Sequence, residues 1–310
     1  ERKAGHSGRA CASMQELQDR FDVVIAGDGE KTIGLALAAD PPAFIDADDP
    51  STTLFLTKDD LNAAPFPARH LIDIGSYHYN IDGYPPQSLI AQLGCPFGCN
   101  FCGGRRSPFL RRVRLRSTEV VIAEMRSMYE QYGTRGFMFL DDELNVNPKF
   151  GALLEQICRL QDELGVDFRL RGLIKSELLT APMATAMYRA GFRQLLVGFE
   201  SGSPRMLMNM NKHATQEDNT RCVERLQGAG LTVKALMSFG HPGESQETIS
   251  ATREWLLAVK PDDFDVTIIT VYPGTPYYDD AVHIGPNHWT YTAVNGDRLH
   301  ACDVSHLQDV

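Results

Sequence analysis

Three cysteines in one short loop constrain this sequence more than any other feature. Cys95, Cys99 and Cys102 follow an apolar stretch, and their spacing is C-x3-C-x2-C. Zinc sites usually need four ligands, commonly as two cysteine pairs. Iron–sulfur cubes are held by cysteine thiolates, normally four of them. Three thiols without an obvious fourth favour a [4Fe–4S] cluster with one iron open to a small ligand. A three-cysteine zinc knuckle and a chance group of buried cysteines are the alternatives.

The residues around these cysteines resemble the cluster loop of the radical S-adenosylmethionine (SAM) enzymes. The loop reads Cys95-Pro-Phe-Gly-Cys99-Asn-Phe-Cys102-Gly-Gly. The resemblance implies that the open iron chelates the amino and carboxylate groups of SAM, and that an electron from the cluster splits the sulfonium to give a 5′-deoxyadenosyl radical. It also implies SAM contacts at Phe101 and Gly103. The other cysteines, at positions 11, 158, 222 and 302, are expected to be small buried hydrophobes.

Length and composition indicate an ordinary globular protein. The 310 residues, of which 43% are apolar, allow one large domain or two modest ones. No apolar run is long enough for a transmembrane helix, and no signal peptide is visible, although the sequence opens at Glu1 rather than Met. The net charge of −10 argues against a general nucleic-acid binder, because phosphate binding needs basic surface. Clustered cysteines fit a reducing compartment, so we expect a cytoplasmic protein.

Residues 1–46 carry the pattern of an α/β unit. A β-branched run at 21–26 suits a buried parallel strand, the turn Gly27-Asp-Gly-Glu30 follows, and residues 31–39 have helical character. This order resembles the last strand and helix of the cobalamin-binding domain that precedes many radical SAM cores. The resemblance implies a cobalamin site that includes Gly5, Gly27, Gly29 and Glu30. The earlier strands of that domain and its Asp-x-His-x-x-Gly signature are not found in this sequence, so a plain structural extension is the alternative.

Residues 47–87 are expected to be a linker between two domains. Prolines at positions 50, 65, 67, 85 and 86 interrupt regular structure. The segment 65–73 resembles the linker of the cobalamin-dependent subfamily, which implies that Arg69 and His70 can reach a cofactor at the domain interface. A structural role for each of these two residues is the alternative.

Residues 88–282 alternate between short apolar runs and helical patterns. Strands are predicted before Cys95 and at 136–142, 167–172, 194–200, 231–239 and 264–271. Helices are predicted at 119–132, 148–164, 181–190 and 245–259, and two short helices, separated by a polar break near His213, within 203–229. Ser117 or Thr118 is the expected N-cap of the first helix. The alternation predicts an α/β fold in which helices cover a parallel sheet. Six such repeats match the (β/α)6 partial TIM-type barrel of the radical SAM family.

The loops after these strands are expected to line the active site, because parallel barrels place their sites at the carboxyl ends of the strands. An ammonium group needs an anionic or carbonyl acceptor, and the acids after the second strand stand where the family receives the SAM amino group. Later turns at 198–202 and 239–244 also resemble turns of the family. The resemblance implies further SAM contacts at Asp141, Asp142, Arg171, Glu200, Ser201, Ser238 and Gly240. Structural salt bridges and turns are the alternatives.

Six arginines fall between residues 105 and 116 of this acidic chain. Guanidinium groups suit phosphate and carboxylate recognition, so Arg111 and Arg112 are predicted to bind an anionic small-molecule substrate, or to dock an electron donor such as flavodoxin or ferredoxin. A solvated rim in which the arginines pair with Asp and Glu is the alternative. Tyr272, in a segment that resembles the sixth strand end of the family, is expected to border the substrate.

Residues 283–310 show no recognisable periodic element and are expected to fold over the open side of the barrel. Taken together, the resemblance implies a cobalamin-dependent radical SAM methyltransferase that transfers a methyl group to an unactivated carbon. The alternatives are a radical SAM cyclase or rearrangement enzyme without methyl transfer, a methylthiotransferase, and a non-catalytic iron–sulfur or zinc protein.

Overall fold

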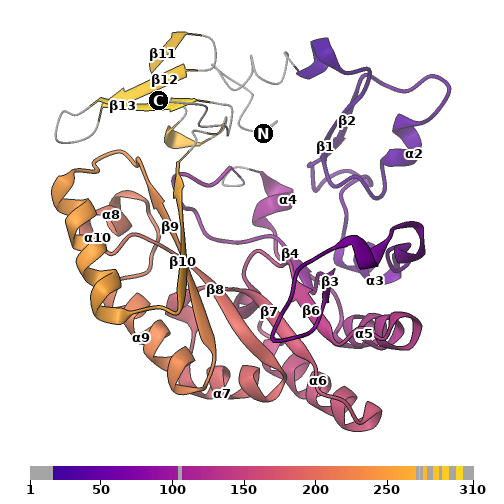
Figure 1. The fold of residues 1–310 in the computed structure, drawn as a ribbon. Helices are drawn as coiled ribbons and strands as arrows, with labels where there is room; N and C mark the ends of the chain where they lie inside the picture. The colour runs from indigo at the N-terminus through magenta and orange to yellow at the C-terminus, as the bar shows by residue number, and fades with distance from the viewer. Residues whose placement is uncertain are drawn as a thin grey trace.

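The computed structural model describes residues 17–103, 107–269, 272 and 275–277, and the backbone of residues 282–285, 288–292 and 298–302. Its centre is a six-stranded parallel sheet in the order β10-β9-β8-β7-β6-β3 (Figure 1). The strands are β3 (Pro86–Leu89), β6 (Gly136–Phe139), β7 (Arg169–Ile174), β8 (Phe192–Glu200), β9 (Thr232–Phe239) and β10 (Asp263–Ile268). The sheet has two edge strands, β3 and β10, so it is an open, partial barrel as predicted.

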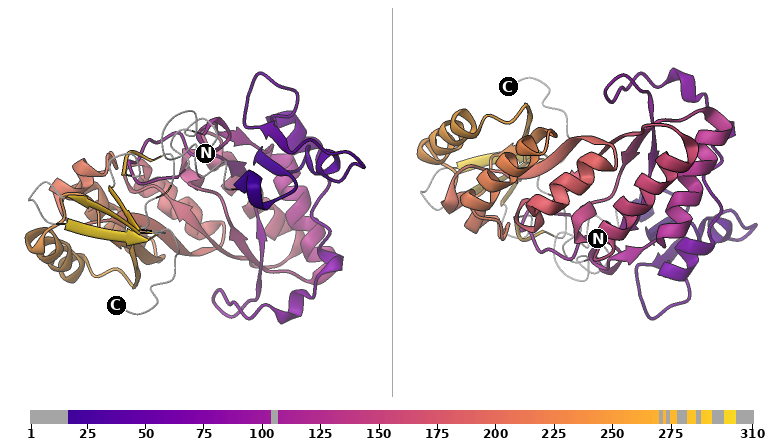
Figure 2. Two further views of the ribbon diagram at one scale, coloured as in Figure 1. Left: turned by 90° about the horizontal axis from the view of Figure 1, so that it is seen from above. Right: turned by 90° about the horizontal axis from the view of Figure 1, so that it is seen from below.

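Five helices cover the outer face of this sheet (Figures 1 and 2). They are α5 (Thr118–Tyr132), α6 (Phe150–Leu164), α7 (Ala181–Arg189), α9 (Gln216–Gly228) and α10 (Gln246–Val259). The Ser117 side chain accepts a hydrogen bond from the Val120 amide and caps α5, as predicted. A short helix, α8 (Pro204–Asn209), precedes α9.

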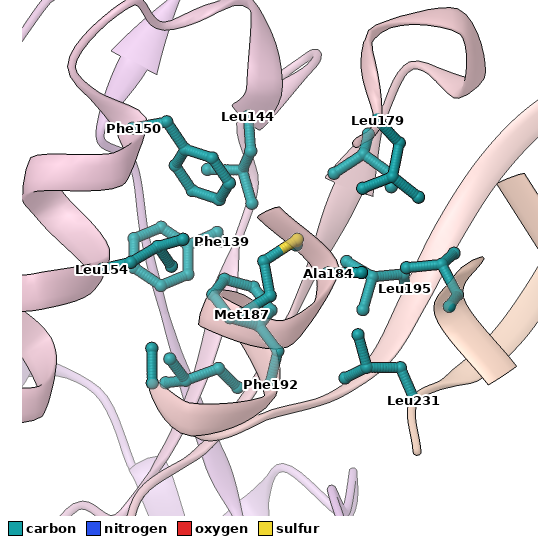
Figure 3. Packing of buried hydrophobic residues seen from close by; sticks show 14 of the residues in the cluster. Phe139, Leu144, Phe150, Leu154, Leu179, Ala184, Met187, Phe192, Leu195 and Leu231 are labelled. Carbon is teal, nitrogen blue, oxygen red and sulfur yellow. The ribbon is translucent and has the colours of Figure 1, made fainter. Parts of the chain in front are cut away.

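The hydrophobic core lies between the sheet and these helices (Figure 3). Phe139 of β6 stacks on Phe192 of β8 with ring centroids 5.8 Å apart, and Phe150 of α6 meets Phe192 edge-on at 6.3 Å. Burial alternates along β7, because successive strand residues point to opposite faces. The outward residues of β7 are therefore buried under helices, and its Arg169 and Arg171 point toward the inside of the barrel.

The N-terminal unit is a small parallel α/β element beside the barrel (Figure 1). It consists of β1 (Val24–Gly27), α2 (Ile33–Ala36) and β2 (Phe44–Ala47), and β1 pairs in parallel with β2. The strand and helix were predicted, whereas β2 was not. The following segment is less irregular than its prolines indicated, because it contains α3 (Lys58–Ala63), which begins with a capping box between Thr57 and Asp60.

The N-terminal unit is bonded to the chain just after the cluster loop. There, α4 (Pro108–Arg111) is followed by β5 (Arg114–Leu115), which pairs antiparallel with β4 (Gln92–Leu93). The buried Arg114 guanidinium forms an ion pair with Asp28, in the turn after β1. Asp48, just after β2, accepts hydrogen bonds from the Ser107 hydroxyl at 3.0 Å and from the Phe109 amide at 2.8 Å.

The segment before β3 lies across the amino ends of the barrel strands. The Tyr84 ring lies beside the guanidinium groups of Arg135, at 4.8 Å, and Arg169, at 5.5 Å. Arg171 lies over the Tyr79 ring at 4.7 Å, and Asp82 pairs with Arg169 at 2.8 Å. Arg135 and Arg169 stand at the starts of β6 and β7, and Arg171 lies further along β7, so residues 79–84 form the base of the barrel.

The C-terminal segment contains regular structure, contrary to the expectation for residues 283–310. Strands β11 (Val282–Gly285), β12 (His288–Thr292) and β13 (Arg298–Cys302) form an antiparallel three-stranded sheet. Polar and apolar or aromatic residues alternate in these short strands, most clearly in β12 (His-Trp-Thr-Tyr-Thr), and this was the signal that could have predicted them. None of the helices in the described parts of the chain is long and apolar enough to cross a membrane.

Candidate functional site

The cluster loop begins at a glycine that no other residue could replace without strain. Gly94 has a φ of +91°, and a Cβ at this position would stand 2.4 Å from the carbonyl oxygen of Arg112. The loop can approach the segment after α4 this closely because Gly94 has no side chain. Cys95 follows immediately, and its amide donates to the Leu110 carbonyl at 2.8 Å.

The three thiols of the loop are available as ligands. Cys95, Cys99 and Cys102 are free, with the first two half-buried and the third exposed. Burial is the main cause that raises the pKa of Cys95, to about 11, and it raises the pKa of Cys99 as well. Iron would reverse this preference, because a coordinating thiol is deprotonated. Among the described residues, no three His, Cys, Asp or Glu side chains are grouped around a single-ion position.

The segment after α8 supports the cluster loop from below. The Asn100 amide donates to the Met210 carbonyl, and the Asn100 side chain donates to the Asn209 carbonyl, both at 2.8 Å. In return, the Asn211 side chain donates to the Gly98 carbonyl at 2.8 Å. Two asparagines therefore fix the loop on both sides of Cys99.

Arg111 supports the same loop through its side chain. Its guanidinium donates to the carbonyl oxygens of Pro96, at 2.6 Å, and Phe97, at 2.8 Å. These contacts give Arg111 a role in bracing the loop, and its contact with a substrate stays a prediction. Arg112 is exposed, and its guanidinium lies 5.7 Å from the centre of the Phe55 ring.

The other described arginines between residues 105 and 116 form ion pairs with acidic side chains, which was the alternative to anion binding. Arg114 pairs with Asp28, and Arg116 pairs with Glu124 at 2.6 Å. Arg105 and Arg106 lie outside the described residues. The run therefore connects the cluster loop with its surroundings, and Arg112 is the described member left pointing to solvent.

The two acids predicted to meet the SAM amino group hold the base of the loop. The buried Asp141 carboxylate accepts hydrogen bonds from the amides of Ala91, at 3.1 Å, and Gln92, at 2.6 Å. Asp142 accepts one from the Gly94 amide at 3.1 Å. Burial raises the pKa of Asp141 to about 7 in spite of these bonds. Their oxygen atoms are engaged with the backbone, so their contacts indicate a structural role.

The next acid in the chain, Glu143, was not selected from the sequence and is the better placed of the three. Its side-chain oxygen Oε2 is buried and has no hydrogen-bond partner among the described residues. Burial raises its pKa to about 7, although Lys212 and Lys175 oppose that shift. It also raises the pKa of Cys95 electrostatically, so the two side chains are neighbours. The run of three acids was the signal that could have indicated it.

The end of β8 carries a partly buried carboxylate that contacts several loops. Glu200 has a φ of +64°, and its Oε1 pairs with Lys212 Nζ at 3.2 Å. Its Oε2 accepts a hydrogen bond from the Ser238 hydroxyl at 2.8 Å. A Cβ at position 198 would stand 2.7 Å from Glu200 Oε1, so glycine at that position leaves room for the carboxylate.

The turn after β9 meets the cluster loop through aromatic rings. Ser238 lies 2.7 Å from the buried His241 ring, and His241 meets Phe101 edge-on with centroids 5.2 Å apart. Burial lowers the pKa of His241 to about 4, so this ring is neutral near pH 7. Gly240 has a φ of +87°, which only glycine adopts readily. Glu200, Ser238 and Phe101 are thus brought together around His241, with Gly240 beside it, and their contact with SAM stays a prediction.

The other three residues predicted to contact SAM lie in three separate parts of the barrel. Ser201 is buried, and its hydroxyl lies 2.9 Å from that of Thr252 in α10. This hydrogen bond connects the end of β8 with a helix on the outer face of the sheet. Arg171 lies in the middle of β7, on Tyr79, and not at the strand end, where Lys175 stands instead. Gly103 lies at the end of the cluster loop, 3.7 Å from the half-exposed Tyr272 if a Cβ is built on it.

The residues predicted to contact cobalamin are spread over two places. Gly27, with a φ of +102°, is packed against Ala47, while Gly29 and Glu30 are exposed in the turn that follows it. Arg69 pairs with the buried Glu124 at 2.6 Å and is structural, and His70 is exposed. Gly5 lies outside the described residues.

Comparison with known proteins shows what class of protein carries this loop. Residues 89–256 match the family model described as the Radical SAM superfamily. The match covers more than half of the chain, and the chain belongs to this superfamily. Its members are enzymes that hold a [4Fe–4S] cluster and use SAM, and the three free thiols of the loop suit such a cluster.

Two curated relatives have names that refer to methyl transfer. An uncharacterized methyltransferase of Pyrococcus horikoshii is 30% identical over 70% of this chain and 46% of its own length. The bacteriochlorophyllide d C-12(1)-methyltransferase of Chlorobaculum tepidum is 29% identical over 62% of this chain and 42% of its own. The chain thus spans less than half the length of either relative.

The solved structure of TsrM from Kitasatospora setae is similar in fold. TsrM is described as a radical SAM methyltransferase with cobalamin and a [4Fe–4S] cluster bound. The TM-score is 0.59 at 23% identity, and the alignment covers 68% of this chain and 43% of TsrM. At this identity the likeness extends to the fold.

Proposed function

We propose that this chain is the catalytic core of a cobalamin-dependent radical SAM methyltransferase that acts on a small molecule. The observation that carries the proposal is the joining of two units at one place. The three-thiol loop closes at β5, and the N-terminal α/β unit is bonded to that same segment through the Asp28–Arg114 ion pair. An α/β unit beside the cluster loop is what a second cofactor near the cluster requires.

The relatives support methyl transfer as the outcome. Two of them carry methyltransferase names, and the fold neighbour TsrM is described with cobalamin bound. The bound groups would supply the difficult chemistry: reductive cleavage of SAM at the cluster and methyl donation by the corrinoid. The protein supplies binding, orientation and exclusion of water.

The residues would divide this work according to their contacts. Cys95, Cys99 and Cys102 would hold the cluster, with Asn100 and Arg111 fixing the loop. Glu143 would receive the SAM ammonium group, because its buried Oε2 has no partner among the described residues. A cation there would also lower the raised pKa of this carboxyl and keep it ionised. Glu200 and Ser238, at the ends of β8 and β9, would border the rest of SAM.

The decisive experiment is anaerobic reconstitution with iron, sulfide and a cobalamin, followed by incubation with SAM and dithionite. The proposal expects four irons per chain, retained corrinoid, and formation of both 5′-deoxyadenosine and S-adenosylhomocysteine. Cys99→Ala should lose iron and both products, whereas Cys158→Ala, on the outer helix α6, should lose neither.

The rival functions have distinct outcomes in this assay. 5′-Deoxyadenosine without S-adenosylhomocysteine or bound corrinoid would favour a cyclase or rearrangement enzyme and refute the methyl-transfer proposal. Neither product from a fully loaded cluster would favour an electron carrier. A single bound zinc would remove the entire family of mechanisms from consideration.

A further inference from the structure

Two lysines from different loops meet beneath the cluster loop. Lys175 follows β7 directly, and Lys212 follows α8. Their side chains are only 2% and 7% exposed. Burying an ammonium group is costly unless it is paired, so two such groups beside one loop call for a physical reason.

Both ammonium groups are held firmly in place. Lys175 Nζ pairs with Glu177 at 2.8 Å and donates to the Lys212 carbonyl at 3.0 Å, while Lys212 Nζ pairs with Glu200 at 3.2 Å. The Lys175 backbone is fixed as well, because its amide and carbonyl both bond to the Asn145 side chain at 2.8 Å. These positions are defined by the fold and do not depend on flexible surface side chains.

The lysines face one side of the cluster loop. Lys175 Nζ lies 4.3 Å from the centre of the Phe97 ring, two residues before Cys99. Asn211, the residue before Lys212, donates to the carbonyl of Gly98, the residue before Cys99, at 2.8 Å. Both lysines therefore stand next to the part of the loop that carries Cys99.

We propose that Lys175 and Lys212 are positioning residues that set the reduction potential of the cluster by placing two buried positive charges beneath its Cys99 corner. Reduction adds one negative charge to a cluster already surrounded by thiolates. Nearby buried cations stabilise that added charge more strongly than exposed ones, since the local dielectric constant is low. Net charge around a cluster is one of the factors that fix its potential. The inference depends on the cluster alone and not on cobalamin or methyl transfer.

The test is a dithionite redox titration of the reconstituted protein without SAM, followed by electron paramagnetic resonance. Lys212→Met and Lys175→Met remove a charge while keeping an apolar stem of similar length. Each should make reduction at least tenfold less favourable, a fall of about 59 mV in a one-electron midpoint. Lys212→Arg and Lys175→Arg keep the charge and should stay close to the parent value.

Lys234→Met is the matched control. Lys234 also lies inside the barrel, but it is in β9 and pairs with Asp263 and Asp265 of β10, both at 3.0 Å, away from the cluster loop. The midpoint reduction potential of Lys234→Met should match that of the unsubstituted protein. Unchanged midpoints in fully iron-loaded Lys212→Met and Lys175→Met would overturn the proposal, as would an equal fall in Lys234→Met.

Iron content separates an effect on the reduction potential of the cluster from an effect on its assembly. If both methionine variants lose iron while both arginine variants keep it, the charges serve to hold the cluster, and the assignment to potential is wrong. Absence of methyl transfer in the parent would leave this titration unaffected, so the two proposals fail independently.

Discussion

The ion pair between Arg114 and Asp28 should be a main source of stability for the contact between the N-terminal unit and the barrel. Both side chains are largely buried, 4% and 10% exposed. Arg114 also donates to the carbonyls of Leu56, at 3.0 Å, and Phe109, at 2.8 Å. Arg114→Met leaves a buried carboxylate without its cation, and breaking a buried pair in this way costs about 3–5 kcal/mol.

The neighbouring Arg112 provides a control with the same chemical change. Its guanidinium is exposed and lies over Phe55 at 5.7 Å, an interaction worth about 0.5–1 kcal/mol. Arg112→Met should therefore cost only about that amount. Asp28→Asn combined with Arg114→Met should cost less than the sum of the two single changes, because the double variant has no unpaired buried charge.

Urea unfolding followed by circular dichroism measures these differences, and limited proteolysis reports whether residues 17–47 detach first. We expect Arg114→Met to unfold at markedly lower urea and to be cut in the N-terminal unit. Free energies of unfolding for Arg114→Met and Arg112→Met that agree within about 1 kcal/mol would refute the reasoning, since the buried pair would then add nothing beyond a surface contact.

Three further predictions follow from single residues. Gly27→Ala should destabilise the N-terminal unit by more than the roughly 1–2 kcal/mol of a left-handed residue, because its Cβ would also stand 2.5 Å from the Ala47 carbonyl carbon, whereas Gly29→Ala, which meets nothing within 4 Å, should be nearly neutral in thermal unfolding. Asp141→Asn should lower iron content after reconstitution, because it weakens the bonds to the Ala91 and Gln92 amides; full iron loading would contradict this. The pKa of His241 is lowered to about 4, below its unfolded value near 6.5. The unfolded protein therefore binds more protons at this histidine between these two pKa values. Acidification from pH 7 to 5 should lower the free energy of unfolding by about 2 kcal/mol, and His241→Gln should remove that loss.

The framework of the fold could be predicted from local patterns. Runs such as Gly136–Phe139 are short and apolar, and the five runs predicted from residue 136 onward became strands of the parallel sheet, whereas the run at 21–26 became β1 of the N-terminal unit. Ser117 was recognised as a cap because the capping hydrogen bond spans only three residues. The missed helix α3 carried an equally local signal in Thr57 and Asp60, so that omission was avoidable.

Residues of the candidate site could be predicted when they lie close together in the sequence. Residues that meet only in the folded chain could not. The three cysteines could be selected from their spacing alone. Lys175 and Lys212 could not, because they lie 37 residues apart and meet through a hydrogen bond that only the tertiary structure creates. Arg171 was assigned to a strand end since β7 was expected to stop at residue 172, and it continues to Ile174.

The aromatic contacts at the start of the strands redefine where the catalytic unit begins. Tyr79 and Tyr84 precede the first barrel strand, yet they fill the end of the barrel opposite the cysteines by resting on Arg171, Arg135 and Arg169. A truncated protein that starts at β3 would lose these aromatic contacts and expose the three arginines to water. A fragment that keeps the whole barrel must therefore start before Tyr79, within the stretch that was predicted from its prolines to be a linker.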